Sequence, residues 1–167
     1  SSLAKPKRLS PRDKAGDNEM NLRLYDIIYS LQRFFQERLG VRVDWIYDGY
    51  KHPDERPYMT IEVITDERTV LSKQREAVQI VEHLQLGYHA TNIVDRTKKA
   101  EEIADLLTFN KIPYFDTEKS TAEPVGDFLC EVVAVTPMPA DDISKESERH
   151  RVYFDIEIEK IVRGGIK

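Results

Sequence analysis

The sequence contains a single cysteine, Cys130, and therefore cannot build an internal disulfide framework. Cys130 lies in an apolar stretch, which predicts a small buried side chain, because a reactive thiol needs a basic and partly exposed setting. No apolar run approaches the ~20 residues of a membrane span, and the N-terminus has no hydrophobic segment of a secretory signal. We therefore expect a protein of the cell interior, or one assembled there, with no membrane role.

Motifs for catalysis and for cofactors are scarce. Glycine is rare and forms no phosphate-binding loop, since Gly164-Gly165 lies near the end of the chain. The histidines lack the spacing of a zinc site, and we expect them at surfaces or interfaces; they are His52, His83, His89 and His150. No serine or cysteine has an evident base. The expectation is a protein that is not an enzyme and uses no metal or cofactor.

A metal-dependent nuclease is the main enzymatic alternative. Pro53-Asp54 and Glu157-Ile158-Glu159-Lys160 resemble the acidic and lysine elements of PD-(D/E)xK nucleases, in which carboxylates hold Mg²⁺. However, Asp54 falls in a proline-rich loop, and strand alternation places Glu157 and Glu159 opposite the apolar stripe. A solvated strand face is the favoured interpretation, and the nuclease is retained as the less favoured one.

Composition and charge are typical of one folded domain with an acidic body. The 167 residues are 40% hydrophobic and 33% charged, with a net charge of −5. Residues 1–19 carry five basic and three acidic side chains, a net charge of +2, which leaves −7 for the rest. We expect an extended basic arm over residues 1–19, one domain over 20–163 and a flexible tail over 164–167. An acidic body disfavours tight non-specific DNA binding but suits a surface past which DNA slides.

Apolar periodicity predicts two helices. The first, Asn21–Leu39, has an apolar face at three- and four-residue spacing, with Asp17 or Asn18 as its cap and Gly40 at its C-terminal end. The second, Arg96–Phe109, is expected to be capped by Asp95. Both helices should pack one face against a sheet.

Alternation predicts strands at Val41–Tyr47, Tyr58–Thr65, Glu76–Tyr88 and Ile112–Phe115, then two long strands over Phe128–Ala134 and Val152–Val162. This order favours an α+β fold with an antiparallel or mixed sheet, two helices on one face and long protruding hairpins. Glu82 interrupts an apolar strand face, so part of that strand is expected to leave the core or to meet another subunit. Exposed hairpin edges favour pairing between subunits.

The charged connection Asp66–Glu76 is longer than the about two to five residues that a hairpin turn needs, and it predicts a projecting arm. A solvated loop is one interpretation of this arm. The other is an intersubunit contact of mixed charge, in which complementarity sets register more than affinity. The candidate residues for this subunit interface are Glu67, Arg68, Lys73, Arg75 and Glu76.

Several segments between Met20 and Arg163 follow one another in a distinctive order. An opening helix leads directly into a strand, and Tyr58–Thr65 passes through the charged arm into Glu76–Tyr88. Leu84-Gln85-Leu86-Gly87-Tyr88-His89 then precedes a basic helix start, Arg96-Thr97-Lys98-Lys99, and Ile112-Pro113-Tyr114-Phe115 precedes an acidic hairpin. This layout resembles the phage tail terminator proteins, also called tail completion or tail-to-head joining proteins.

The resemblance implies a homo-oligomeric ring, usually a hexamer, in the neck of the virion and assembled in the host cytoplasm. Such a ring caps the tail-tube protein, stops its polymerisation and meets the head connector, while DNA passes through the pore without specific binding. Asp155, Glu157 and Glu159 would then form an acidic strand facing the lumen or the ring. Lys5, Lys7 and Arg8 would belong to an arm that binds an acidic neighbour. Another neck protein or a tail-tube protein is the structural alternative.

Overall fold

A mixed five-stranded sheet forms the centre of the protein in a computed structural model, which describes residues 21–140, 144–145 and 148–164. The strand order is β1-β2-β3-β7-β6, and only the β1–β2 pair is parallel. These strands are β1 (Arg42–Trp45), β2 (Tyr58–Val70), β3 (Ala77–His89), β6 (Glu131–Met138) and β7 (Arg151–Arg163). A separate small sheet pairs β4 (Ile112–Tyr114) with β5 (Gly126–Phe128).

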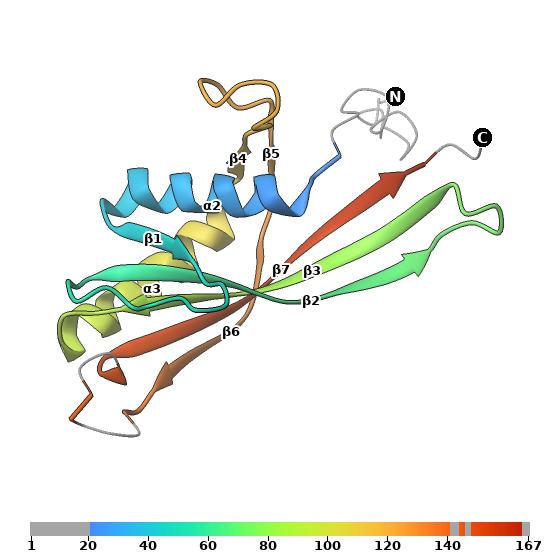
Figure 1. Cartoon of the computed structure of the whole chain (residues 1–167). Coiled ribbons are helices and arrows are strands. Elements are labelled where there is room, and N and C mark those ends of the chain that lie inside the picture. The colour runs from blue at the N-terminus through green and yellow to red at the C-terminus, as the bar shows by residue number, and fades with distance from the viewer. Residues whose placement is uncertain (1–20, 141–143, 146–147, 165–167) are drawn as a thin grey trace, which may run out of the picture.

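Helices α2 (Leu24–Leu39) and α3 (Ile93–Phe109) complete the described part of the chain and confirm the expected α+β fold (Figure 1). Both helices contribute to one apolar core with alternate residues of β3 and β7. Ile27 and Leu31 of α2 and Ile103 and Leu107 of α3 are fully buried there, as the periodicity predicted. The core therefore lies on one face of the sheet.

The helix ends correct part of the sequence prediction. Gly40 ends α2 with a φ of 64°, the left-handed conformation expected there. The predicted cap from Asp17 or Asn18 is wrong, because α2 begins at Leu24 with Arg23 at the N-cap position. In α3 the cap is Asn92, whose side chain accepts a hydrogen bond from the Asp95 backbone N–H at 2.8 Å.

Nearly half of the predicted arm Asp66–Glu76 is strand. β2 continues to Val70 and pairs with β3 down to Val78, so only residues 71–76 form the turn. β7 lies on the other side of β3 and reaches Arg163, opposite Ala77. We call Thr65–His83 together with Ile158–Arg163 the finger. Figure 1 shows this three-stranded ribbon extending past the end of α2.

A β-bulge marks the base of the finger. Val63 pairs with Leu84 and Thr65 pairs with His83, which leaves Ile64 as the extra residue, 54% exposed. A bulge locally increases the twist of a strand and changes its direction. The finger therefore begins at the point where β2 leaves the body of the sheet.

The single strand predicted over Phe128–Ala134 is divided between two sheets. Phe128 pairs with Ile112 in the small sheet, whereas Val132 pairs with Ile156 in the large one. Between them, Cys130 is buried, as predicted, while Leu129 is exposed. Apolar and polar residues alternate without a break where the chain passes from the small sheet to the large one. The sequence pattern therefore did not reveal that two strands are present.

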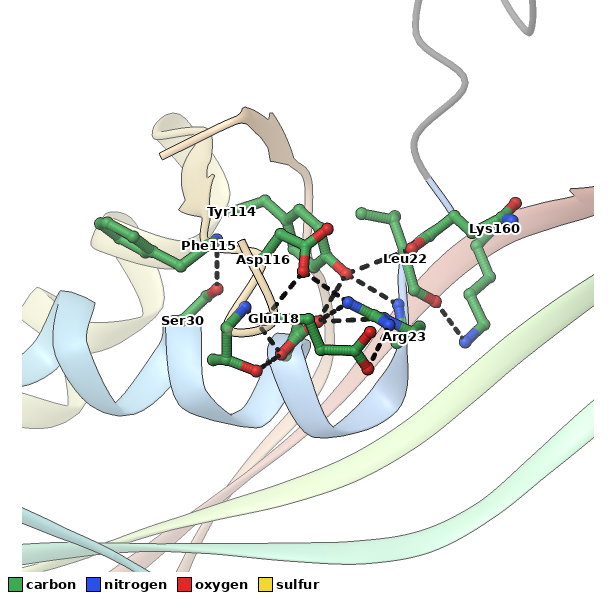
Figure 2. A network of polar contacts seen from close by, with 11 residues as sticks. Leu22, Arg23, Ser30, Tyr114, Phe115, Asp116, Glu118 and Lys160 are labelled. Atoms are coloured by element: carbon green, nitrogen blue, oxygen red, sulfur yellow. Dashed lines mark hydrogen bonds and ion pairs between the residues drawn. The ribbon is translucent and has the colours of Figure 1, made fainter. Parts of the chain in front are cut away.

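A polar network fastens the start of α2 to the segment after β4 (Figure 2). The Arg23 guanidinium lies 2.5 Å from Asp116, 3.0 Å from buried Asp26 and 2.7 Å from Glu118. The Tyr114 hydroxyl accepts a hydrogen bond from the Arg23 backbone N–H. These contacts satisfy a backbone donor that lacks a side-chain cap, and they fix where the chain enters the helix.

The part of β3 beyond Glu82 leaves the helix-covered body of the sheet, as predicted, whereas Glu82 itself is buried. Its carboxylate lies 3.0 Å from Lys160 Nζ, and both side chains are buried. Lys160 also donates a hydrogen bond to the Leu22 carbonyl at 2.6 Å (Figure 2). This ion pair joins β3 and β7 at the base of the finger and ties them to the segment that leads into α2.

We expect Lys160→Met to lower the free energy of unfolding by ~3–5 kcal/mol, because it leaves the buried Glu82 carboxylate without its counter-charge. Urea denaturation measures the loss. The double variant Glu82→Leu/Lys160→Met removes both charges and should recover most of the stability. A single variant as stable as the wild type would show that the pair is not buried as described.

Candidate functional site

The face of the sheet opposite the helices carries its polar residues in rows across β2, β3 and β7. Directly opposed residues share a face, and alternate residues of each strand repeat it. Starting at the end away from the finger, the rows are Tyr58–His89–Arg151, Thr60–Gly87–Tyr153, Glu62–Gln85–Asp155, Thr65–His83–Glu157 and Glu67–Val81–Glu159. One half of this face is aromatic and the half that continues into the finger is acidic.

The acidic half gathers six carboxylates from three strands, which we call the acidic face: Glu62, Glu67, Glu131, Asp155, Glu157 and Glu159. The sequence predicted that Asp155, Glu157 and Glu159 point away from the apolar stripe, and this is confirmed. It missed Glu62 and Glu131 as their neighbours, because only long-range strand register brings them together. Glu67, predicted at the arm, also belongs here.

The side chains that contact these carboxylates are neutral or weakly basic. Gln79 donates to Glu159 at 2.6 Å and Gln85 donates to Asp155 at 3.1 Å. Among the described residues, no lysine or arginine forms an ion pair with the acidic face. The carboxylates therefore keep most of their negative potential, which would repel a nucleic-acid backbone.

His83 stands in the middle of the acidic face. Its Nδ1 lies 3.2 Å from Glu157, and its Nε2 lies 3.0 Å from Glu67 without the geometry of a directed hydrogen bond. The two carboxylates approach opposite sides of the ring, so they cannot hold one ion together with it. Within the described ranges, no group of three or more metal-ligating side chains is close enough to bind a metal ion.

The residues behind the nuclease alternative are divided by the sheet. Glu157 and Glu159 lie on the acidic face, whereas Lys160 points to the other side and is occupied by Glu82. Asp54 lies exposed in the loop between β1 and β2. A lysine on the opposite side of the sheet cannot act on a group that these carboxylates hold.

The five predicted interface residues fall into two groups. Arg68 pairs with Asp66 of its own strand at 3.0 Å, and Glu67 contacts His83. Lys73, Arg75 and Glu76 are exposed in the turn at the tip of the finger. Neither Lys73 nor Arg75 forms an ion pair with any residue that the structure describes.

The aromatic half contains a buried histidine, which corrects the expectation that all histidines lie at surfaces or interfaces. His89 is 1% exposed and stacks on Tyr58, with ring centroids 4.3 Å apart. His52 lies 5.3 Å away. Both ring nitrogens of His89 lack a hydrogen-bond partner among the described residues. Burial, and then the charges of His52, Arg56 and Arg151, lower the pKa of His89 to about 3.

Gly87 lets the side chains of Thr60 and Tyr153 lie close together on the aromatic half of the face. A Cβ atom there would lie 2.6 Å from Thr60 Oγ1 and 2.9 Å from the Tyr153 ring. Gly87 marks a close approach of side chains and not a bulge, since the β3 register is continuous there. Any larger residue at position 87 would force Tyr153 outward.

Some predicted residues are not described. Lys5, Lys7 and Arg8, with the whole predicted arm 1–19, lie outside the described residues, as do positions 165–167 of the predicted tail. Neither helix of the described chain has the length and apolar character needed to cross a membrane.

Burial raises the pKa of the Cys130 thiol to about 12.

Comparison with known proteins identifies no family for this chain. No model of a known protein family matches the sequence. The curated proteins give no match either. A functional assignment must therefore rest on the sheet face, on the finger and on the resemblance in layout.

His89 should make stability depend on pH. A histidine in the unfolded chain binds its proton near pH 6.5, whereas folded His89 stays neutral down to about pH 3. The contribution of His89 to the free energy of unfolding is therefore present above pH 6.5. It falls by about 2 kcal/mol as the pH is lowered from 7 to 5. Urea denaturation across this range should show the loss, and His89→Phe should abolish this component. An unchanged pH dependence in His89→Phe would contradict the assignment.

Proposed function

We propose that this chain is a structural subunit of the phage tail terminator kind, which forms a ring at the neck of a virion and has no catalytic role. The ring caps the tail tube, stops polymerisation of the tail-tube protein and joins the tail to the head connector. The observation that carries this proposal is the acidic face, which continues into a ribbon whose outer edges are unpaired among the described residues.

The acidic face is suited to line a channel for DNA. Its carboxylates come from three strands and lack lysine or arginine partners among the described residues. Several copies around an axis would surround DNA with negative charge, which disfavours the phosphate contacts that hold DNA to proteins. DNA would then pass through the ring without specific binding.

The finger is suited to hold neighbouring copies. A ribbon that extends past the helices leaves main-chain donors and acceptors unpaired, and closed cyclic symmetry satisfies such edges. Val70 and Leu71 at its tip are 44% and 48% exposed, beside Lys73 and Arg75. Exposed apolar side chains next to unpaired cations are typical of a contact surface.

The proposed place of the ring in the virion is supported by the layout from Met20 to Arg163, which resembles that of the tail terminators. The tail-tube protein and the head connector are then its partners besides further copies of itself, and assembly occurs in the host cytoplasm. Lys5, Lys7 and Arg8 provide a basic arm for an acidic neighbour. This role requires no metal, cofactor or catalytic residue.

Electron microscopy of the purified protein tests the proposal. Single closed rings with an open centre are the expected result. Long filaments would indicate a tail-tube protein, and particles with no central channel at any concentration would contradict a ring. Cleavage of DNA that requires Mg²⁺ and is lost in Glu157→Ala would instead support the nuclease.

Reversing the charge of the acidic face should create affinity for DNA. The triple variant Asp155→Lys/Glu157→Lys/Glu159→Lys is expected to bind double-stranded DNA at low salt, whereas the wild type should not bind it. Fluorescence anisotropy with a labelled duplex measures this difference, which should shrink as salt rises. A matched control places the same number of lysines on exposed positions of α3, Glu101, Glu102 and Asp105. Equal affinity of both variants for the duplex would show that the acidic face has no special role.

A further inference from the structure

The finger has two free edges within the described residues. On one side, β1 ends opposite Ile61, so the outer edge of β2 is unpaired from Glu62 onward. On the other side, β6 begins opposite Glu157, which leaves the outer edge of β7 unpaired from Ile158 onward. Each edge presents main-chain groups that another strand can pair with.

The two edges match in length. Beyond the bulge at Ile64, the free edge of β2 runs over Thr65–Val70, and that of β7 runs over Ile158–Arg163, six residues each. Both strands are antiparallel to β3, so they run in the same direction. A neighbouring copy in a similar orientation would therefore present its strand parallel to the first, which is an allowed ladder.

The two edges also differ in charge. The β2 edge carries Asp66 and Glu67 against Arg68, a net charge of −1. On the β7 edge Arg163 balances Glu159, because Lys160 is already neutralised by Glu82, and the net charge is therefore 0. Pairing of two β2 edges would bring two net negative charges together, whereas pairing of β2 with β7 avoids this repulsion.

We propose that the β2 edge of the finger in one copy pairs with the β7 edge of the finger in the next copy. The sheet then continues from copy to copy through a head-to-tail contact, which closes into a ring when the rotation permits. This inference rests on the ring proposed above and names the contact that builds it. It also places the acidic faces of successive copies side by side on one continuous surface.

Engineered cysteines test this contact. Glu67 and Glu159 lie in one row with Val81 of β3 between them, so their Cα atoms are about 9.6 Å apart, or two strand spacings. A disulfide needs Cα atoms within about 7 Å, so Glu67→Cys/Glu159→Cys cannot close within one chain. Glu67→Cys/Ile161→Cys allows for a shift of two residues in register. Native Cys130 does not interfere, because it is buried and its thiol is protonated.

The matched control is Glu62→Cys/Asp155→Cys. These residues lie in an equivalent row across Gln85, but β6 already occupies the outer edge of β7 at Asp155. Each variant is oxidised mildly and run on a non-reducing gel, with the oligomeric state measured by light scattering on the same sample. A ladder of covalent oligomers from either test pair, and not from the control, is the expected result.

Other outcomes overturn the contact. Rings without covalent oligomers would leave the ring standing and reject edge pairing. A covalent dimer from Glu67→Cys alone would indicate contact between two β2 edges. Neither rings nor covalent products at high protein concentration would reject both the edge pairing and the proposed function.

Discussion

The pairing of β3 with two neighbours along almost its whole length is the constraint on which the rest of the structure depends. β7 flanks all thirteen residues of β3 and β2 flanks Val78–His89, whereas the helices cover only the part nearer His89. A sheet longer than its helical cover must project as a ribbon. The finger is therefore a direct consequence of strand length. Its edges have no partner among the described residues because β1 and β6 stop at the base of the finger.

The same register organises the charges of the sheet. Alternation sends Leu84 and Ile156 into the core and sends His83 and Glu157 to the opposite face. The exception, Glu82, lies on the core side and is neutralised by Lys160. The acidic face and the buried ion pair thus have a common origin in strands that continue beyond the apolar core. Our proposal of a ring uses both products of this geometry, the carboxylates on one face and the main-chain groups on the edges.

Local patterns in the sequence were sufficient for much of the fold. The apolar stripes of α2 and α3, the left-handed Gly40 and the alternation of β7 are encoded within each element, and the structure confirms them. Long-range features could not be read in this way. The break between β5 and β6 depends on which sheet each half joins, and the acidic face depends on register between strands far apart in the chain. The cap of α3 was misplaced because Asn92 and Asp95 are both good capping residues, and only the backbone geometry selects Asn92.

Hydrogen exchange of the finger amides tests the central claim most directly, in dilute and in assembled protein. The account predicts that outward amides of Thr65–Val70 and Ile158–Arg163 exchange fast in the isolated chain and slow together on assembly. The outer edge of β6 provides the internal reference, since it should not change. Equal exchange at the finger in both states would contradict pairing of its edges between copies.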